Sequence, residues 1–169
     1  GERVVVVDCD VIRAQLSREL GFASGDGGLH EALNSESGAS AQHEVAGDGL
    51  RVVPITRPFA KGERLTERGR LQRVLARLRD DYDLVLLDCP PILPIAESRE
   101  IVALADGVVL VVQWRKTTDR VIRAALRQLP VRTIRHLGVV LNQVDMRKQV
   151  RFGGNDAASF YEKYRGYYA

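Results

Sequence analysis

Five short runs, most of them continuously apolar, constrain the fold of this chain more than any other feature. They cover residues 4–7, 50–55, 84–87, 107–112 and 137–142. A strand with one face in water usually alternates apolar and polar residues, whereas a strand buried on both faces is apolar throughout. Because helical patterns separate the runs, the sequence predicts an α/β fold. We expect a doubly wound, mostly parallel sheet with helices on both faces.

The segments between these runs carry the helical patterns. One apolar face recurs at helical spacing, formed by Leu71, Val74, Leu75 and Leu78. Further helices are predicted over "LHEALN", over 97–104, over 117–129 with Thr117 or Thr118 as N-cap, and over 155–165. With 169 residues, 45% of them hydrophobic, the chain is expected to form a single domain over 1–169.

Composition limits the classes of function. No apolar stretch approaches the roughly 20 residues that span a bilayer, and no signal peptide is evident, so a soluble, cytosolic chain is expected. The net charge of +3 does not require a nucleic-acid partner, and none is predicted. Cys9 and Cys89 are far apart in sequence and no Cys/His cluster surrounds them. They are therefore interpreted as reduced, small buried side chains rather than a disulfide framework or zinc site.

Two of the apolar runs end in the same pair, Asp followed by Cys, in "VVVVDCD" at 4–10 and "LVLLDCPP" at 84–91. A carboxylate at the end of a buried strand is costly unless hydrogen bonds, a cation or solvent offset its desolvation. The carboxyl ends of parallel strands meet at one edge, so we expect Asp8, Asp10 and Asp88 to gather there. Such a group predicts Mg²⁺ shared with substrate phosphates. The alternative is that Asp8 and Asp88 only cap the turn or helix that follows.

These two segments resemble the Walker A′ and Walker B motifs of the deviant-Walker ATPases related to MinD and ParA. Together with "ADGVVLVVQWRKTT" at 105–118, "LGVVLNQVD" at 137–145 and "FYEKYRGYYA" at 160–169, they make nearly the whole chain similar to the cytoplasmic domain of bacterial tyrosine kinases. Those kinases accompany capsule and exopolysaccharide biosynthesis. The resemblance implies a P-loop NTPase-like fold, ATP and Mg²⁺ as cofactors, and ATP-dependent protein-tyrosine autokinase activity that regulates polymer assembly and export.

The resemblance also implies a setting. It places the chain at the cytoplasmic face of the bacterial inner membrane, in a ring-shaped homo-oligomer, with a membrane activator segment or polysaccharide co-polymerase as partner. The alternative function is a non-kinase switch of the MinD/ParA kind, in which nucleotide only sets dimerisation, or a degenerate scaffold domain.

Residue roles follow from the resemblance position by position. Asp8 would lie nearest the reacting phosphoryl group and orient the attacking hydroxyl or accept its proton, while Asp10 and Asp88 would hold Mg²⁺, largely through its waters. Asn142 would contact adenine; the alternative is an ordinary Asn at a strand-end turn. The tail over 160–169 would carry phospho-acceptors used in trans, at Tyr161, Tyr164, Tyr167 and Tyr168. The alternative for the tail is an aromatic helix end that packs on the sheet.

A phosphate-binding loop, GxxxxGK[ST], does not occur in these 169 residues. In the family that loop lies just upstream of the Walker A′ strand, so the expectation is an N-terminally truncated domain that is inactive alone. Without the backbone amides of that loop, the carboxylates repel phosphate. The chain by itself is therefore expected to bind ATP poorly, and a micromolar affinity in a titration would contradict this.

Overall fold

The computed structural model describes residues 1–22, 27–35, 42–45, 49–130 and 134–145. The predicted helix over 155–165 and the tyrosine tail over 160–169 lie outside these ranges. The described chain divides into two compact units, Gly1–Ala105 with Gln128–Pro130, and Asp106–Arg127 with the residues from Val131 onward. The single domain over 1–169 stays a prediction. No helix in the described ranges is both long and apolar enough to cross a membrane.

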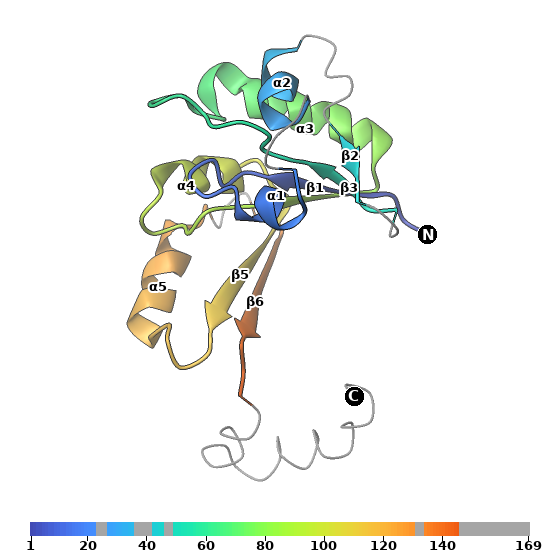
Figure 1. The fold of residues 1–169 in the computed structure, drawn as a ribbon. Helices are drawn as coiled ribbons and strands as arrows, with labels where there is room; N and C mark the ends of the chain where they lie inside the picture. The colour runs from blue at the N-terminus through green and yellow to red at the C-terminus, as the bar shows by residue number, and fades with distance from the viewer. Residues whose placement is uncertain (23–26, 36–41, 46–48, 131–133, 146–169) are drawn as a thin grey trace. The chain divides into compact units, whose positions relative to one another are not determined.

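The first unit is built on a four-stranded sheet in the order β2-β3-β1-β4 (Figure 1). Its strands are β1 (Val4–Asp8), β2 (His43–Glu44), β3 (Arg51–Val53) and β4 (Leu84–Asp88). β1 runs parallel to both β3 and β4, and only the two-residue β2 is antiparallel. The register aligns Asp8 directly with Asp88. The predicted parallel α/β fold is therefore confirmed in this unit.

The helices of the first unit are α1 (Gln15–Glu19), α2 (Leu29–Asn34), the 3₁₀ turn η1 (Glu67–Gly69), α3 (Arg70–Asp81) and α4 (Ala96–Val102). Helices α2 and α3 lie together over one face of the sheet (Figure 1). The four apolar residues predicted to share one face of α3 are all buried, and they belong to the main hydrophobic core. α2 coincides with the predicted "LHEALN" helix.

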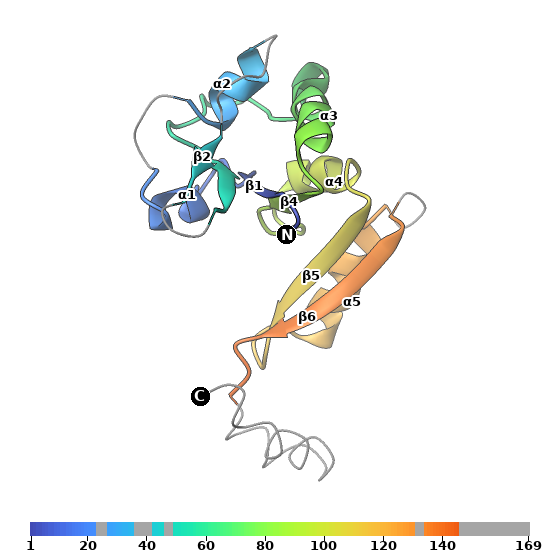
Figure 2. The same ribbon diagram turned by 90° about the vertical axis from the view of Figure 1, so that its right-hand side faces the viewer.

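The second unit pairs β5 (Gly107–Gln113) in parallel with β6 (His136–Asn142), with α5 (Asp119–Gln128) between them in sequence. Figure 2 shows α5 lying along one face of this strand pair. The hydroxyl of Thr118 accepts a hydrogen bond from the Val121 N–H at 3.4 Å. This contact confirms Thr118, one of the two predicted candidates, as the N-cap of α5.

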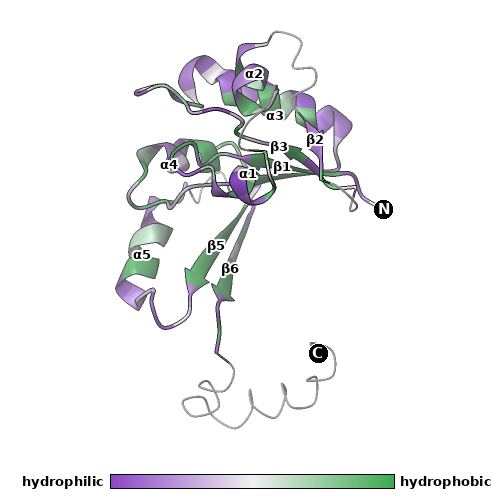
Figure 3. Cartoon of the chain, in the orientation of Figure 1, coloured by the Kyte–Doolittle hydropathy of each residue, from purple (hydrophilic) through white to green (hydrophobic). Residues whose placement is uncertain are grey.

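Figure 3 shows that the strands are mostly hydrophobic, but burial is uneven along them. In β1, Val5 and Val7 are fully buried, as expected for a central strand. In contrast, Leu86 of β4 is 45% exposed and Val109 of β5 is 61% exposed. The sequence predicted strands covered on both faces, because continuous apolar runs are typical of that environment. Within the described ranges, every residue of β1 is buried or half-buried, β4 and β5 alternate between exposed and at least half-buried residues, and β6 is exposed along its whole length.

The start of α2 depends on a close approach between two backbone segments. Gly28, its N-cap, has φ of 108°, and the Leu29 N–H donates to the Pro54 carbonyl oxygen at 2.7 Å. A Cβ atom on residue 28 would lie only 2.5 Å from that oxygen. Glycine is therefore required here both by its positive φ and by the space available.

Replacing Gly28 by alanine is expected to lower the free energy of unfolding by about 2 kcal/mol, because strain and overpacking add. Urea denaturation measures the change. Gly21→Ala is the matched control, since Gly21 also has positive φ (82°) but has open space around it. Its expected cost is only about 1 kcal/mol, from the backbone alone. Equal losses in the two variants would contradict the steric argument.

Candidate functional site

Asp8, at the carboxyl end of β1, is a fully buried carboxylate held by three donors from its own chain. Its Oδ2 accepts hydrogen bonds from the Ser17 N–H at 3.0 Å and from the Ser17 hydroxyl at 2.6 Å. Its Oδ1 accepts one from the Asp10 N–H at 3.1 Å. A carboxylate has about four acceptor positions, so three are used. These hydrogen bonds, rather than solvent, offset the cost of burying Asp8.

Ser17 extends this network to the next strand. Its Oγ accepts a hydrogen bond from the Ile55 N–H at 2.8 Å, just beyond the end of β3. The Ser17 hydroxyl therefore links the ends of β1 and β3 through Asp8, and it is itself fully buried. Ser17 is not among the site residues that the sequence predicts. The sequence shows only a serine nine residues after the strand-end Asp. That spacing does not predict a contact unless the conformation of the turn between the two residues is known.

Asp10 and Asp88 complete the acidic group. Asp10 is half-buried, and its Oδ1 accepts hydrogen bonds from the N–H groups of Ile12 and Arg13 at 3.2 and 3.1 Å, which shapes the turn after β1. Asp88 is exposed and directly opposite Asp8 in the register. The structure thus brings together the three carboxylates that the sequence predicted to gather, and each has a different environment.

The pKa of Asp88 is raised above its ordinary value. Partial burial is the largest cause, followed by repulsion from the Asp8 and Asp10 carboxylates. Burial and the two neighbouring carboxylates together therefore disfavour ionisation of Asp88. A cation beside these carboxylates would relieve the repulsion. Within the described part of the chain, no group of three or more His, Cys, Asp or Glu residues is arranged to hold a metal ion.

The raised pKa predicts how stability depends on Asp88. A carboxyl whose pKa is higher in the folded protein opposes folding once it is ionised, and this penalty disappears as pH falls below the ordinary value of 3.8. In a metal-free buffer at neutral pH, Asp88→Asn is therefore expected to raise Tm slightly, by about 1–2 °C since Asp88 is exposed. The difference should shrink toward pH 3.5 in thermal scans. A variant less stable than the parent at pH 7 would contradict this.

A second buried hydroxyl holds the chain after β4. Ser98, at the start of α4, donates a hydrogen bond from its Oγ to the carbonyl oxygen of Pro90 at 3.0 Å and is 1% exposed. It fixes the turn that follows Asp88, as Ser17 fixes the turn that follows Asp8. Ser98 is not predicted from the sequence either, since a serine within a short helix carries no distinctive pattern.

A cavity of about 360 Å³ lies beside the ends of β1 and β4. Its lining includes Cys9, Ile12, Phe59, Glu63, Pro90 and Glu97. The loop over 59–63 therefore forms one wall, and the residues that follow the two strands form the other. This places two carboxylates, Glu63 and Glu97, in the lining near the acidic strand ends.

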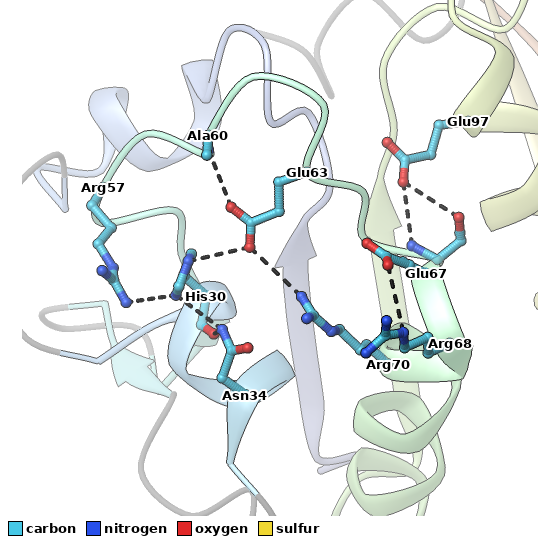
Figure 4. Close-up of polar contacts among 10 residues, drawn as sticks. His30, Asn34, Arg57, Ala60, Glu63, Glu67, Arg68, Arg70 and Glu97 are labelled. Atoms are coloured by element: carbon cyan, nitrogen blue, oxygen red, sulfur yellow. Dashed lines mark hydrogen bonds and ion pairs between the residues drawn. The ribbon is translucent and has the colours of Figure 1, made fainter.

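Figure 4 shows how the loop wall is fixed by a cluster around His30 and Glu63. Glu63 accepts a hydrogen bond from the Ala60 N–H at 3.1 Å and pairs with His30 Nε2 at 3.3 Å and with Arg70 at 3.6 Å. Arg57 lies 2.6 Å from His30 Nδ1. A guanidinium only donates, so Nδ1 accepts, and the proton of the neutral ring lies on Nε2, toward Glu63. These contacts hold Glu63 at the cavity.

Asn142, the predicted adenine contact, ends β6 in the second unit. Its backbone carbonyl accepts a hydrogen bond from the Trp114 N–H at 2.9 Å, and its side-chain Oδ1 accepts one from the Gln143 N–H at 2.8 Å. Gln143 has φ of 56°, so Asn142 takes part in a strand-end turn. Its side chain is exposed.

Comparison with known proteins identifies the family. A family model described as an AAA domain matches residues 1–133. The chain belongs to this AAA domain family. Succinoglycan biosynthesis transport protein ExoP of Rhizobium meliloti is 27% identical to this AAA domain over 99% of the chain, but over only 21% of ExoP itself. The chain thus spans about a fifth of the length of such a relative.

Two solved structures share the fold of this AAA domain. The tyrosine kinase domain of BceF is 30% identical, with a TM-score of 0.66 over 83% of this chain and 56% of that one. The kinase domain of VpsO is 24% identical, with a TM-score of 0.75 over 85% of this chain and 71% of that one. The predicted resemblance to bacterial tyrosine kinases of exopolysaccharide systems, and the predicted P-loop NTPase-like fold class, are therefore confirmed.

Proposed function

We propose that this AAA domain is the ATP-dependent tyrosine autokinase domain of a capsule or exopolysaccharide system. The observation that carries the proposal is the in-register pair Asp8 and Asp88, at the ends of adjacent parallel strands, in a chain similar over nearly its whole length to a succinoglycan transport protein. Phosphoryl transfer depends mainly on positioning and charge neutralisation, and a cluster of strand-end carboxylates suits both tasks.

ATP and Mg²⁺ are the proposed cofactors. Mg²⁺ prefers oxygen ligands, retains several waters and is usually bound by one or two carboxylates together with substrate phosphates. The raised pKa of Asp88 beside Asp8 and Asp10 supports a cation at this edge, since a positive charge there would relieve the repulsion. In the proposal Asp10 and Asp88 hold the metal, largely through water, and Asn142 contacts adenine. The metal would neutralise charge on the transferred phosphoryl group.

Asp8 is proposed to act on the tyrosine hydroxyl through its remaining acceptor position, by orienting it or accepting its proton. Its fully buried carboxylate also positions the turn that carries Asp10, because Oδ1 binds the Asp10 N–H. The two roles of Asp8 can be separated by experiment. Loss of the positioning role would lower the stability of the fold, whereas loss of the direct role would lower only the rate of phosphoryl transfer. The phosphate-binding loop required for ATP is proposed to come from a segment outside these 169 residues.

The proposed acceptors are the tail tyrosines Tyr161, Tyr164, Tyr167 and Tyr168. Four phenols within eight residues offer several sites in a short stretch. Each phosphate adds a charge close to −2, so several on one tail would repel one another and the acidic strand ends. This repulsion supports a cycle in which phosphorylation loosens a homo-oligomeric ring at the cytoplasmic face of the inner membrane, next to a membrane activator or polysaccharide co-polymerase.

A non-kinase nucleotide switch is the second candidate. MinD of Aquifex aeolicus, in its complex with MinC, shares the fold with a TM-score of 0.72 at 15% identity, over 96% of this chain and 65% of that one. A switch of that kind uses nucleotide only to set association, and it needs no tyrosine acceptors.

Mass spectrometry of the protein expressed from its whole gene separates the two candidates. After incubation with ATP and Mg²⁺, the kinase is expected to carry phosphate on the tryptic peptides that contain Tyr161, Tyr164, Tyr167 and Tyr168. The control is the same incubation with EDTA. A protein that hydrolyses ATP but carries no phosphate on these peptides would refute the kinase proposal and support the switch.

A further inference from the structure

The two cysteines of this chain lie side by side at the ends of β1 and β4. The β1–β4 register aligns Asp8 with Asp88, and the Cys9 N–H continues the ladder by donating to the Asp88 carbonyl oxygen at 2.8 Å. Cys9 belongs to the hydrophobic core and Cys89 packs against the same core, so both side chains lie on one side of the sheet. The neighbouring Cys89 thiol and burial both raise the pKa of the Cys9 thiol well above its ordinary value.

The typical spacing of adjacent strands is compatible with the Cα separation of a disulfide. Neighbouring strands are about 4.7–4.9 Å apart, and bridged cysteines have Cα atoms about 4.4–6.8 Å apart. Both cysteines are free thiols, and the chain contains no others. Any disulfide within one chain therefore joins Cys9 to Cys89.

Each thiol is also within reach of a small oxidant. Cys89 is half-buried and partly open to solvent. Cys9 is only 1% exposed, but it lines the 360 Å³ cavity together with Phe59 and Pro90. A molecule as small as hydrogen peroxide can approach the pair from the surface at Cys89 or from the cavity at Cys9.

We propose that Cys9 and Cys89 form a reversible intramolecular disulfide when the protein meets a hydroperoxide. The Cys89 sulfur displaces water from hydrogen peroxide and becomes a sulfenic acid. The Cys9 sulfur then attacks the Cys89 sulfur, which forms the S–S bond and releases a second water. Two thiols and one peroxide give one disulfide and two waters, so sulfur is oxidised and peroxide oxygen is reduced. A dithiol reverses the reaction by exchange.

The position of the bond connects it to the acidic group. Each cysteine directly follows one of the paired carboxylates, so the disulfide would fix the ends of β1 and β4 to each other one residue beyond Asp8 and Asp88. Resting on the proposed function, the further expectation is that the oxidised protein transfers phosphate more slowly and that a dithiol restores the rate.

Peptide mapping tests the disulfide without any activity measurement. Folded protein is treated with hydrogen peroxide, alkylated and digested with trypsin. We expect a linked pair of peptides, 4–13 with 80–99, that has lost the mass of two hydrogens and separates after reduction. Both alkylatable thiols should disappear together. Persistence of two free thiols, or disulfide-linked dimers on non-reducing gels in place of the internal link, would overturn the proposal.

Single variants provide the matched control. In Cys89→Ser the linked peptide cannot form, and Cys9 should stay alkylatable after denaturation because its partner is absent. Cys9→Ser should instead leave Cys89 to accumulate sulfenic acid, detected by a dimedone adduct. If Cys9→Ser fails to fold, the parent protein and Cys89→Ser still decide the question. A disulfide without any change in phosphate transfer would refute only the regulatory consequence, and absent kinase activity would leave the disulfide result intact.

Discussion

Replacing Asp8 by alanine is expected to lower the free energy of unfolding by about 3–5 kcal/mol, one of the largest effects of any single change in the acidic group. The variant removes a fully buried acceptor and leaves two Ser17 donors and the Asp10 N–H without a partner. Each buried donor left unpaired costs about 1–3 kcal/mol. Urea denaturation followed by circular dichroism measures the loss.

Two further variants sharpen the Asp8 experiment. Ser17→Ala keeps the carboxylate but leaves the Ile55 N–H unpaired, so an intermediate loss of about 1–3 kcal/mol is expected. Asp83→Ala removes an exposed carboxylate that pairs with Arg3, and little change is expected because water replaces the lost contact. An Asp8→Ala protein that unfolds at the same urea concentration as the Asp83→Ala protein would show that the buried network does not stabilise the fold.

Asp88→Asn is expected to reduce the initial rate of tail phosphorylation by about 100-fold or more in the protein expressed from its whole gene. The reason is the loss of a carboxylate proposed to hold Mg²⁺, and removal of a group of this kind typically costs about 100-fold in rate or metal affinity. Autophosphorylation is measured over a Mg²⁺ titration. Asp10→Asn should act in the same direction.

The control for Asp88→Asn is Asp81→Asn, which changes an exposed Asp at the end of α3, away from the paired strand ends. Its rate should equal that of the parent protein. The stability measurement adds a second check, because Asp88→Asn is expected to be slightly more stable while it is inactive. A variant that is both stable and fully active would remove Asp88 from the proposed metal site.

Much of the fold could be predicted because it depends on local pattern. The apolar runs predicted β1, β4, β5 and β6 to within a residue or two at each end, and helical spacing predicted the buried face of α3. The elements that escaped prediction are short and depend on contacts from elsewhere. α1 has only five residues and follows Ala14 in a left-handed conformation. It is held by the bonds from Ser17 to Asp8, which no local pattern reveals.

The candidate site was predictable in its acidic residues but not in their environments. Strand-end position identified Asp8, Asp10 and Asp88, because parallel strands bring their carboxyl ends to one edge. A carboxylate can accept hydrogen bonds from the protein or remain open to a ligand. Which of the two holds depends on hydrogen-bond donors that are distant in sequence. Capping of the following turn, left open as an alternative, does describe part of the role of Asp8. For Asp88, no equivalent set of donors surrounds the carboxylate within the described residues.

The sequence by itself determined the parallel α/β class, the apolar strands and the residues at their ends, since these follow from periodicity and chain direction. Only the tertiary structure decided that Asp8 is buried while its register partner Asp88 is exposed, and that Cys9 is buried while Cys89 is half-buried. Burial and contact depend on which segments come together, and here those segments are nine to eighty residues apart. A sequence pattern can identify the residues at a strand end. The neighbours that determine their burial, hydrogen bonds and charge are known only from the folded chain.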